Sequence, residues 1–364
     1  MARVGATLLQ VANRCNVSSS TASRVLNNST KRPFGASSAL RAKLIRAAKE
    51  LNYRPNMAAR NISSAKTKLV AVLGLVGISS EFVGPLEQAV GAACSSVDKA
   101  GYGICVQFIS RRHGPFEAPP LRVDGAIAVG ARNIEELKFL DERGTPYVSL
   151  DGVAGRCGAL VVPDDEGGIR MALRHLIELG HRVIAYLDHP SFEGAHHSVR
   201  DRRTAFASAA EELGFETPSW TLGDLNRTAQ WGLYYERFLL HAVIDGKATA
   251  VLAYSHYGAM SLLREVRDMG LSVPRDFSLV CLNNDPVLSL SIPSLTAVDV
   301  PSAAMGCAAA EILLDAMSGK REASGRSLKM EETLIVRESS RPPSQPIHKI
   351  TTSSGFAAVG SALA

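Results

Sequence analysis

The chain has 364 residues, of which 46% are hydrophobic and 21% charged, and its formal net charge is +5. This composition is that of an ordinary soluble protein, long enough for two or three domains. The sequence has no run of 18 apolar residues and no apolar signal-peptide core, and its six cysteines are scattered without a Cys-x-x-Cys pair. These features argue against membrane spanning and secretion and predict a cytoplasmic protein with reduced cysteines.

The first elements along the chain are two short helices joined by a tight turn. An amphipathic helix is expected at 7–12, and Asn16 is a turn residue that tolerates a left-handed backbone. Ser18 can then cap a second helix that begins at Ser19. Two short helices joined in this way form a helix-turn-helix unit, whose second helix can lie in the major groove of DNA.

The second helix has one apolar and one polar face. Ala22, Val25 and Leu26 recur at helical spacing and are expected to be buried. On the other face Arg24 can pair with a guanine edge or a phosphate, while the small residues allow the backbone to approach the bases. The candidate DNA contacts here are Ser18, Ser19, Ser20, Thr21, Ser23, Arg24 and Asn27.

The charge distribution supports this interpretation independently. Residues 1–68 hold 13 Lys or Arg and a single acid, Glu50, which gives this segment a net charge of +12. The remainder of the chain carries −7. Such an asymmetry is typical of a nucleic-acid module attached to an acidic globular domain.

A third helix is expected at 38–52, closing a small core against the first two helices. Its apolar stripe consists of Leu40, Leu44, Ala47, Ala48 and Leu51. Pro55 biases Arg54 away from helical geometry and so ends the helix. Asn56 can cap a further short segment that ends at residue 62 and would be marginal alone, because so short a helix has not offset its nucleation cost. Residues 63–68 are polar and predict a linker.

From residue 69 the pattern changes to apolar strands alternating with helices. Strands are expected at 69–77, 102–109, 124–130, 147–150, 183–187, 250–254, 277–282, 295–298 and 333–336. Helices are expected at 84–100, 133–143, 166–179, 202–213, 228–241, 257–269 and 303–317. Repeated βα units imply parallel sheets, and the length exceeds one typical sheet, which predicts two α/β lobes. Ligands would bind at the carboxyl ends of the strands, in a cleft between the lobes.

The sequence resembles the lactose-repressor (LacI) family of bacterial transcription regulators over about residues 7–340. The amino-terminal signature is carried by Thr7-Leu-Leu-Gln-Val-Ala12, Thr21-Ala-Ser-Arg-Val-Leu-Asn27 and Ala47-Ala-Lys-Glu-Leu-Asn-Tyr-Arg-Pro-Asn56. Core landmarks such as Gly180-His-Arg182 and Pro293-Ser-Leu-Thr296 follow in the family's order. Gln10 departs from the family's usual Asp and Asn16 from its Gly. Residues 110–121, with three prolines, replace a family helix, and we expect a loop there.

The resemblance implies the domain organisation and the fold. An all-α helix-turn-helix headpiece (1–55) and a hinge helix with linker (56–68) would precede a two-lobed effector-binding and dimerisation domain (69–340). That core would be α/β, with two parallel-sheet lobes like those of periplasmic binding proteins. Residues 341–364, rich in Ser, Pro, Ala and Gly, predict a disordered tail. Further DNA contacts are implied at Tyr53, Arg54, Asn56, Ala59 and Ile62, the last in the position of the family's minor-groove wedge.

The family's effector contacts fall by motif position on Phe82, Asp151, Asp164, Arg202, Leu225, Ser255, His256 and Asn283. Arg202 keeps the family's arginine, which suits a bidentate grip on hydroxyls, a carboxylate or a phosphate. Leu225 replaces an aromatic residue that often stacks on a sugar ring, and Asn283 replaces an Asp. These changes disfavour a simple neutral sugar and leave open a sugar, an anionic metabolite or no ligand.

Two other combinations of residues are candidates for catalysis and for metal binding. Ser255 and His256, with Asp285 nearby in sequence, lack a nucleophile elbow, and we expect no enzymatic activity and no catalytic residues. His196 and His197 are expected in a solvated, Gly-containing loop without a convergent third metal ligand. No metal and no other cofactor is therefore expected.

The sequence thus predicts a cytoplasmic, nucleoid-associated transcription regulator, most simply a repressor. It would act as a homodimer on a near-palindromic operator in double-stranded DNA, respond to a small-molecule effector and have no membrane partner. Two alternatives remain at this point. One is a cytoplasmic solute-binding protein with a vestigial headpiece, and the other is a DNA-binding dimer that no small molecule controls.

Overall fold

The computed structural model describes residues 6–26, 36–53, 66–74, 85–107, 122–189, 196–218 and 231–344. The chain divides into two compact units, Met1–Thr67 and Lys68–Ala364. The predicted hinge segment at 56–62 and the predicted loop at 110–121 lie outside the described residues. No helix in the described part of the chain is long and apolar enough to cross a membrane.

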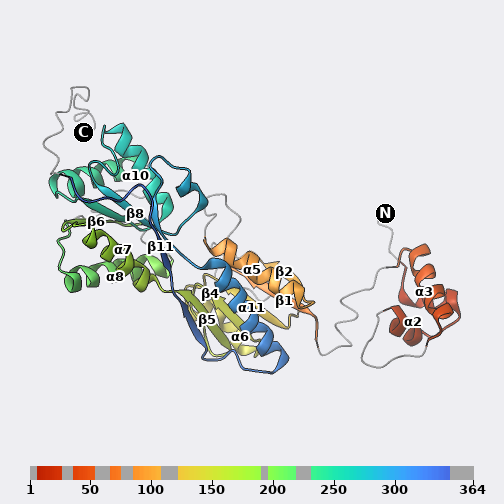
Figure 1. The fold of residues 1–364 in the computed structure, drawn as a ribbon. Coiled ribbons are helices and arrows are strands. Elements are labelled where there is room, and N and C mark those ends of the chain that lie inside the picture. Colours follow the sequence, from red (N-terminus) through yellow and green to blue (C-terminus); the bar gives the residue numbers. More distant parts are fainter. Residues whose placement is uncertain are drawn as a thin grey trace, which may run out of the picture. The chain divides into compact units, whose positions relative to one another are not determined.

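In the described part of the first unit, helices pack around one small core (Figure 1). They are α1 (Leu8–Cys15), α2 (Ser19–Leu26) and α3 (Ser38–Glu50). Their buried residues form one cluster of Val11, Ala12, Cys15, Ala22, Val25, Leu44 and Ala47. The apolar faces predicted for the second and third helices therefore pack against α1, which confirms the expected three-helix arrangement.

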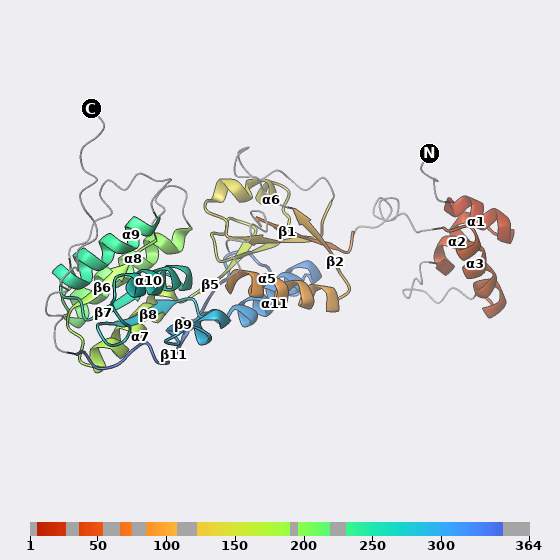
Figure 2. The same ribbon diagram turned by 90° about the horizontal axis from the view of Figure 1, so that it is seen from above.

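The first lobe of the second unit is built on a parallel six-stranded sheet in the order β10-β5-β4-β3-β1-β2. Its strands are β1 (Leu69–Leu73), β2 (Gly103–Gln107), β3 (Gly125–Val129), β4 (Tyr147–Leu150), β5 (Gly158–Pro163) and β10 (Ser327–Met330). Helices α5 (Pro85–Lys99) and α11 (Ser302–Ser318) lie side by side on one face, with η1 (Ile134–Leu137) and α6 (Lys138–Glu142) on the other (Figure 2). A Cβ on Gly306 of α11 would collide with the Ala89 carbonyl of α5, so glycine permits this close crossing.

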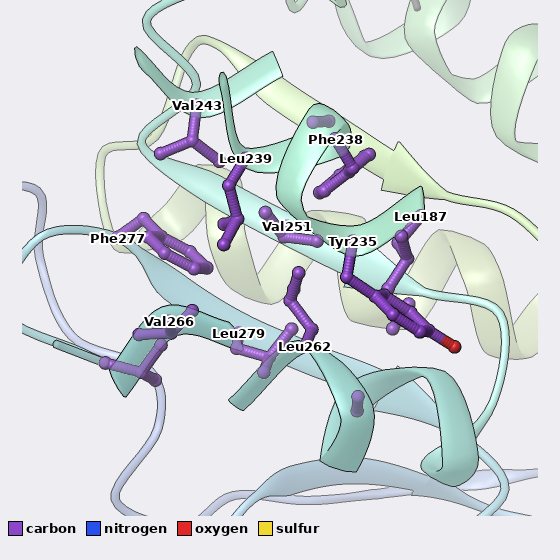
Figure 3. Close-up of a cluster of buried hydrophobic side chains, with 14 of the residues drawn as sticks. Leu187, Tyr235, Phe238, Leu239, Val243, Val251, Leu262, Val266, Phe277 and Leu279 are labelled. Carbon is purple, nitrogen blue, oxygen red and sulfur yellow. The ribbon is translucent and has the colours of Figure 1, made fainter. Parts of the chain in front are cut away.

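The second lobe contains a five-stranded sheet in the order β11-β9-β8-β7-β6. Its strands are β6 (Ile184–Leu187), β7 (Ala250–Ala253), β8 (Ser278–Leu282), β9 (Thr296–Asp299) and β11 (Thr333–Ile335). One face carries α9 (Trp231–Phe238), η2 (Leu239–Asp245) and α10 (His256–Asp268), and the other carries α7 (Asp165–Glu178) and α8 (His197–Leu213). Figure 3 shows Phe238, Leu239, Leu262 and Phe277 packed over this sheet. A short η3 (Pro286–Ser289) follows β8.

The two lobes and their predominantly parallel sheets confirm the predicted architecture, but three local predictions were wrong. Strands β5 and β10 were not expected; β5 begins at Gly158 and ends in Pro163, and β10, at the sheet edge, has three exposed residues and one half-buried one. Strand β11 pairs with β9 in the antiparallel direction. Helix α8 begins at His197 rather than at residue 202, because the His196 side chain accepts a hydrogen bond from the backbone of Ser198 and caps it.

The chain passes between the lobes three times, after β5, β9 and β10. The carboxyl ends of β4 and β5 in one sheet, and of β7 and β8 in the other, lead into the residues that the sequence analysis assigned to effector binding. The topology therefore places these residues at the edges of the sheets where ligands of open α/β folds bind.

The start of the predicted disordered tail contacts the second lobe. The backbone N–H of Arg341 donates to Ser278 Oγ at 3.0 Å, and its carbonyl accepts from His181 Nε2 at 2.9 Å. The prediction was wrong for residues 341–344, because buried polar side chains satisfy this backbone. Residues 345–364 lie outside the described part of the chain.

Candidate functional site

The helix-turn-helix is fixed by side-chain caps at the start of each helix. Thr7 and Gln10 form a capping box on α1, in which Gln10 Oε1 accepts from the Thr7 backbone at 2.8 Å. Gln10, where the family usually has Asp, therefore serves the cap. Asn16 ends α1 with a φ of 55°, and Ser18 Oγ accepts from the Thr21 backbone at 3.1 Å to begin α2. The predicted turn and cap are both confirmed.

The candidate DNA-contacting residues on α2 divide by exposure. Ser20 and Arg24, four residues apart and so on one face of the helix, are exposed, as is Ser18 at the cap. Ser19, Thr21, Ser23 and, after α3, Tyr53 are half-buried. Asn27, Arg54, Asn56, Ala59 and Ile62 lie outside the described residues. The structure thus leaves the polar face of α2 accessible and buries the opposite one.

Arg202 is the central cation of the second candidate site. Its Nε donates to Asp165 Oδ1 at 2.7 Å, its Nη1 to the Tyr254 carbonyl at 2.9 Å and its Nη2 to Asn283 Oδ1 at 2.8 Å. The side chain is only 5% exposed. Burial lowers the pKa of Arg202, but Asp165 and the neighbouring anionic groups raise it above its usual range, so the guanidinium stays charged.

The other predicted effector residues that the structure describes lie at strand ends or helix starts. Asp164 caps α7 and lies 3.2 Å from Lys329 Nζ, and Ser255 caps α10. Asp151 and Asn283 follow β4 and β8 with φ values of 53° and 67°, a left-handed conformation that Asp and Asn tolerate. His256 is buried, and Phe82 and Leu225 lie outside the described residues.

Several buried polar atoms near these residues have no hydrogen-bond partner among the described residues. They are Asp151 Oδ1, His197 Nε2, His256 Nδ1, Tyr186 Oη and Glu332 Oε1. Burial lowers the pKa of His256 and, with Asp165, raises the pKa of Glu332 to about 8. Because an unsatisfied buried polar atom costs free energy, their concentration here indicates a site that a ligand completes.

The two adjacent histidines were predicted incorrectly. They lie at the start of α8 rather than in a solvated loop, and Asp151 supplies a third converging group. His196 Nε2 lies 2.9 Å from the Asp151 carbonyl, and His197 Nε2 lies 3.4 Å from Asp151 Oδ1. Burial opposes ionisation of Asp151, but His196, His197 and Arg202 hold its pKa below the usual value.

Sequence reasoning missed some residues of this site. Asp165, Tyr254 and Glu332 reach Arg202 from three separate segments of the chain. Asp165 and Tyr254 lie next to the motif positions Asp164 and Ser255, a signal that could have found them. Glu332 follows β10, which was itself not predicted, and had no comparable signal.

Known proteins resemble both units of the chain. Residues 7–56 match the family model of bacterial regulatory proteins of the lacI family, and residues 173–340 match that of a periplasmic binding protein-like domain. The HTH-type transcriptional regulator CelR of Thermobifida fusca is 32% identical over 351 residues, which cover 92% of this chain and 98% of CelR.

Solved structures show the same likeness. A lac repressor dimer bound to operator and the anti-inducer ONPF matches with a TM-score of 0.73 at 21% identity, covering 93% of this chain and all of that one (100%). A complex of the transcriptional regulator CelR with cellobiose matches with a TM-score of 0.59 at 25% identity, covering 92% and 100% of the two chains.

Proposed function

Because the chain belongs to the lacI family of bacterial regulatory proteins, and is thus a DNA-binding transcription regulator, we propose that its core controls DNA binding through a small-molecule effector. The first unit would contact operator DNA with Ser18, Ser20 and Arg24 at the exposed face of α2, aided by Ser19, Thr21, Ser23 and Tyr53. The predicted contacts at Asn27 and Arg54 and, in the hinge, at Asn56, Ala59 and Ile62 remain part of this proposal. The protein would act on the bacterial nucleoid in the cytoplasm, as a repressor without enzymatic activity.

The observation that carries effector control is the group of buried, unpartnered polar atoms at the strand ends. His256 Nδ1 and Tyr186 Oη can each make a hydrogen bond that no described residue makes. Asp151, Asp164, Arg202, Ser255 and Asn283, with Phe82 and Leu225, would complete the contacts. A site of this kind gains most from a ligand that satisfies these atoms together.

Although the replacements at Leu225 and Asn283 argue against a simple neutral sugar, the charges around the site favour a neutral, polyhydroxylated ligand over an anionic metabolite. Arg202 is paired with Asp165, and Lys329 with Asp164, so both cations already have carboxylate partners. Buried or half-buried carboxylates at Asp151, Asp164 and Asp165 would repel a further anion. The solved complex of a CelR regulator with cellobiose supports the same class of ligand.

We further propose that the regulator is a homodimer. Beyond β8 the second lobe exposes a row of apolar side chains, with Leu290 79% and Ile292 96% exposed. Large exposed apolar side chains in a row are typical of protein interfaces. A two-fold dimer would present two copies of α2 to the two halves of a near-palindromic operator.

The test is a panel of neutral disaccharides and of phosphorylated or carboxylated sugars. Each compound is added to the full-length protein in a thermal melt, and compounds that shift the melt are added to an operator titration. We expect a neutral compound to change operator affinity at least about fivefold, the lower end of typical allosteric coupling. His256→Gln should reduce that response, whereas His241→Gln, at an exposed position, should retain it.

Two outcomes would reject this proposal. A ligand that binds the core and leaves operator affinity unchanged would assign the core to solute binding alone. Operator binding that no compound of the panel alters, with no shift in any melt, would favour a DNA-binding dimer without small-molecule control.

A further inference from the structure

The side chains of Asp151, His196 and His197 converge where the two lobes meet. Asp151 follows β4 of the first lobe, whereas the histidines begin α8 of the second. His197 Nε2 lies 3.4 Å from Asp151 Oδ1, and His196 Nε2 lies 3.7 Å from Asp151 Oδ2. One ligating atom from each residue lies within 4.8 Å of the others. The effector proposal uses Asp151 but leaves both histidines without a role.

Asp201 determines which nitrogen of His197 faces the first lobe. His197 Nδ1 lies 3.1 Å from Asp201 Oδ2, one helical turn along α8, and the ionised carboxylate can only accept, so Nδ1 donates. In the neutral ring the lone pair of Nε2 then faces Asp151 Oδ1, which is also an acceptor. Neither buried atom has a hydrogen-bond partner in the part of the chain that the structure describes. Two facing acceptors require a cation between them.

A proton is one such cation. Burial lowers the pKa of His197, but Asp151 and Asp201 raise it to about 9. A proton on His197 satisfies that pair alone, and His196 makes its own contact, because its Nε2 lies 2.9 Å from the Asp151 carbonyl, to which it donates. To bind an ion, His196 would give up this hydrogen bond and its acceptance of the Ser198 N–H for the other tautomer, in which Nδ1 donates to Ser198 Oγ at 3.0 Å and the Nε2 lone pair faces the carboxylate.

We propose that Asp151, His196 and His197 bind a divalent metal ion of the zinc class. Imidazole and carboxylate are ligands of such ions, and zinc–nitrogen bonds of about 2.0 Å place tetrahedral ligands about 3.3 Å apart, close to the 3.4 Å between His197 Nε2 and Asp151 Oδ1. Asp201 orients His197 as the carboxylates behind metal-bound histidines do. Three protein ligands leave a fourth position for water or an oxygen of a small molecule.

The ion would join the two lobes, since its ligands come from both. It would therefore stabilise the arrangement of the lobes seen here relative to any in which Asp151 leaves α8. Metal binding as such does not depend on the proposed effector or on DNA binding, so its test can fail while the regulatory proposal stands.

The experiment is a calorimetric titration of Zn²⁺ into the full-length, tag-free protein after chelation and dialysis. We expect one ion per chain and a raised melting temperature of the core. His197→Gln should lower the affinity for Zn²⁺ more than tenfold, and Asp201→Asn about tenfold, the effect typical of second partners of metal ligands. The control is His241→Gln, because His241 also lies four residues before an aspartate, Asp245, at 3.9 Å but belongs to no group of three possible metal ligands among the described residues.

Co²⁺ provides a readout that does not depend on a single variant. The wild-type protein should give the intense visible absorption of a four-coordinate Co²⁺ site, and Asp151→Asn, altered in the other lobe, should lose it while keeping its circular dichroism spectrum. Absence of Zn²⁺ binding to the wild type, or equal affinity in His197→Gln and His241→Gln, would overturn the proposal and leave His197 as a protonated ion-pair partner.

Discussion

Arg24 and Arg202 are the arginines of the two candidate sites, and their surroundings are opposite. Arg24 is exposed on α2, beside Ser20 on the same face of the helix. Arg202 is 5% exposed and donates to acceptors from three separate segments. A binding residue that protrudes from one helix can be changed without disturbing the fold, whereas one that also holds buried acceptors cannot. A variant at Arg24 in the first unit should therefore change DNA binding without changing stability. A variant at Arg202 in the second unit should change ligand binding and stability together.

The largest expected effect is that of Arg202→Ala on the core. Removing the guanidinium leaves Asp165 buried without its counter-ion, and breaking a buried pair in this way costs about 3–5 kcal/mol of unfolding free energy. Urea unfolding measures this loss of unfolding free energy. The matched control is Arg203→Ala on the same helix, where a 46% exposed side chain pairs with Asp188 and about 1 kcal/mol or less is expected. Equal losses in the two variants would contradict the distinction between the sites.

The next effect concerns the pH dependence of stability. Burial and the nearby Asp165 raise the pKa of Glu332 from 4.5 to about 8. Between these values the unfolded chain loses the proton that the folded one keeps, so this group lowers stability as pH rises from about 4.5 to about 8. Glu332→Gln should remove that loss. Its unfolding free energy relative to wild type should rise by a few kcal/mol across this window. A difference that stays constant from pH 5 to pH 8.5 would refute the assignment.

Arg24→Ala should have the converse signature. Loss of a base or phosphate contact should weaken operator binding by ~1–3 kcal/mol, and unfolding should change by no more than ~0.5 kcal/mol, because the side chain is exposed. Arg14→Ala removes the same charge from α1, where Arg14 pairs with Glu50. That control should weaken binding to operator and to non-specific DNA alike, so equal weakening of both kinds of binding in Arg24→Ala would mean that Arg24 supplies only charge.

The smallest expected effect is on the α1 capping box. Thr7→Ala removes the acceptor of the Gln10 backbone N–H and should lower the stability of the first unit by about 1 kcal/mol. Thr7→Ser keeps the hydroxyl and should preserve most of it. Thermal melts of both variants measure the difference, and identical melts would show that the Thr7 hydroxyl does not cap α1.

The same contrast explains why the sequence predicted the α2 face more completely than the Arg202 cluster. The α2 face depends on spacing within eight residues, and its turn, cap and buried side were all predictable from local rules. The Arg202 cluster joins Asp165, Tyr254 and Asn283 through strand ends that only the tertiary fold brings together. Family motif positions located Arg202 and Asn283 but could not reveal that they bond to each other.

The remaining errors have related physical causes. Strand β10 is an exposed edge strand, and its pairing with β5 depends on a chain that returns from the other lobe. The start of α8 was placed too late because His196 caps it, although His is not among the preferred capping residues. Because the predicted helix began too late, the two histidines were expected in a solvated loop, and their convergence on Asp151 was not predicted.

The most direct test of a sequence-specific regulator is the selection of bound fragments of the source genome by the purified protein at near-physiological salt, with Arg24→Ala in parallel. The wild type should enrich a short near-palindrome that Arg24→Ala does not enrich. Indiscriminate retention of DNA by both proteins, or no enrichment by either, would contradict sequence-specific reading by α2.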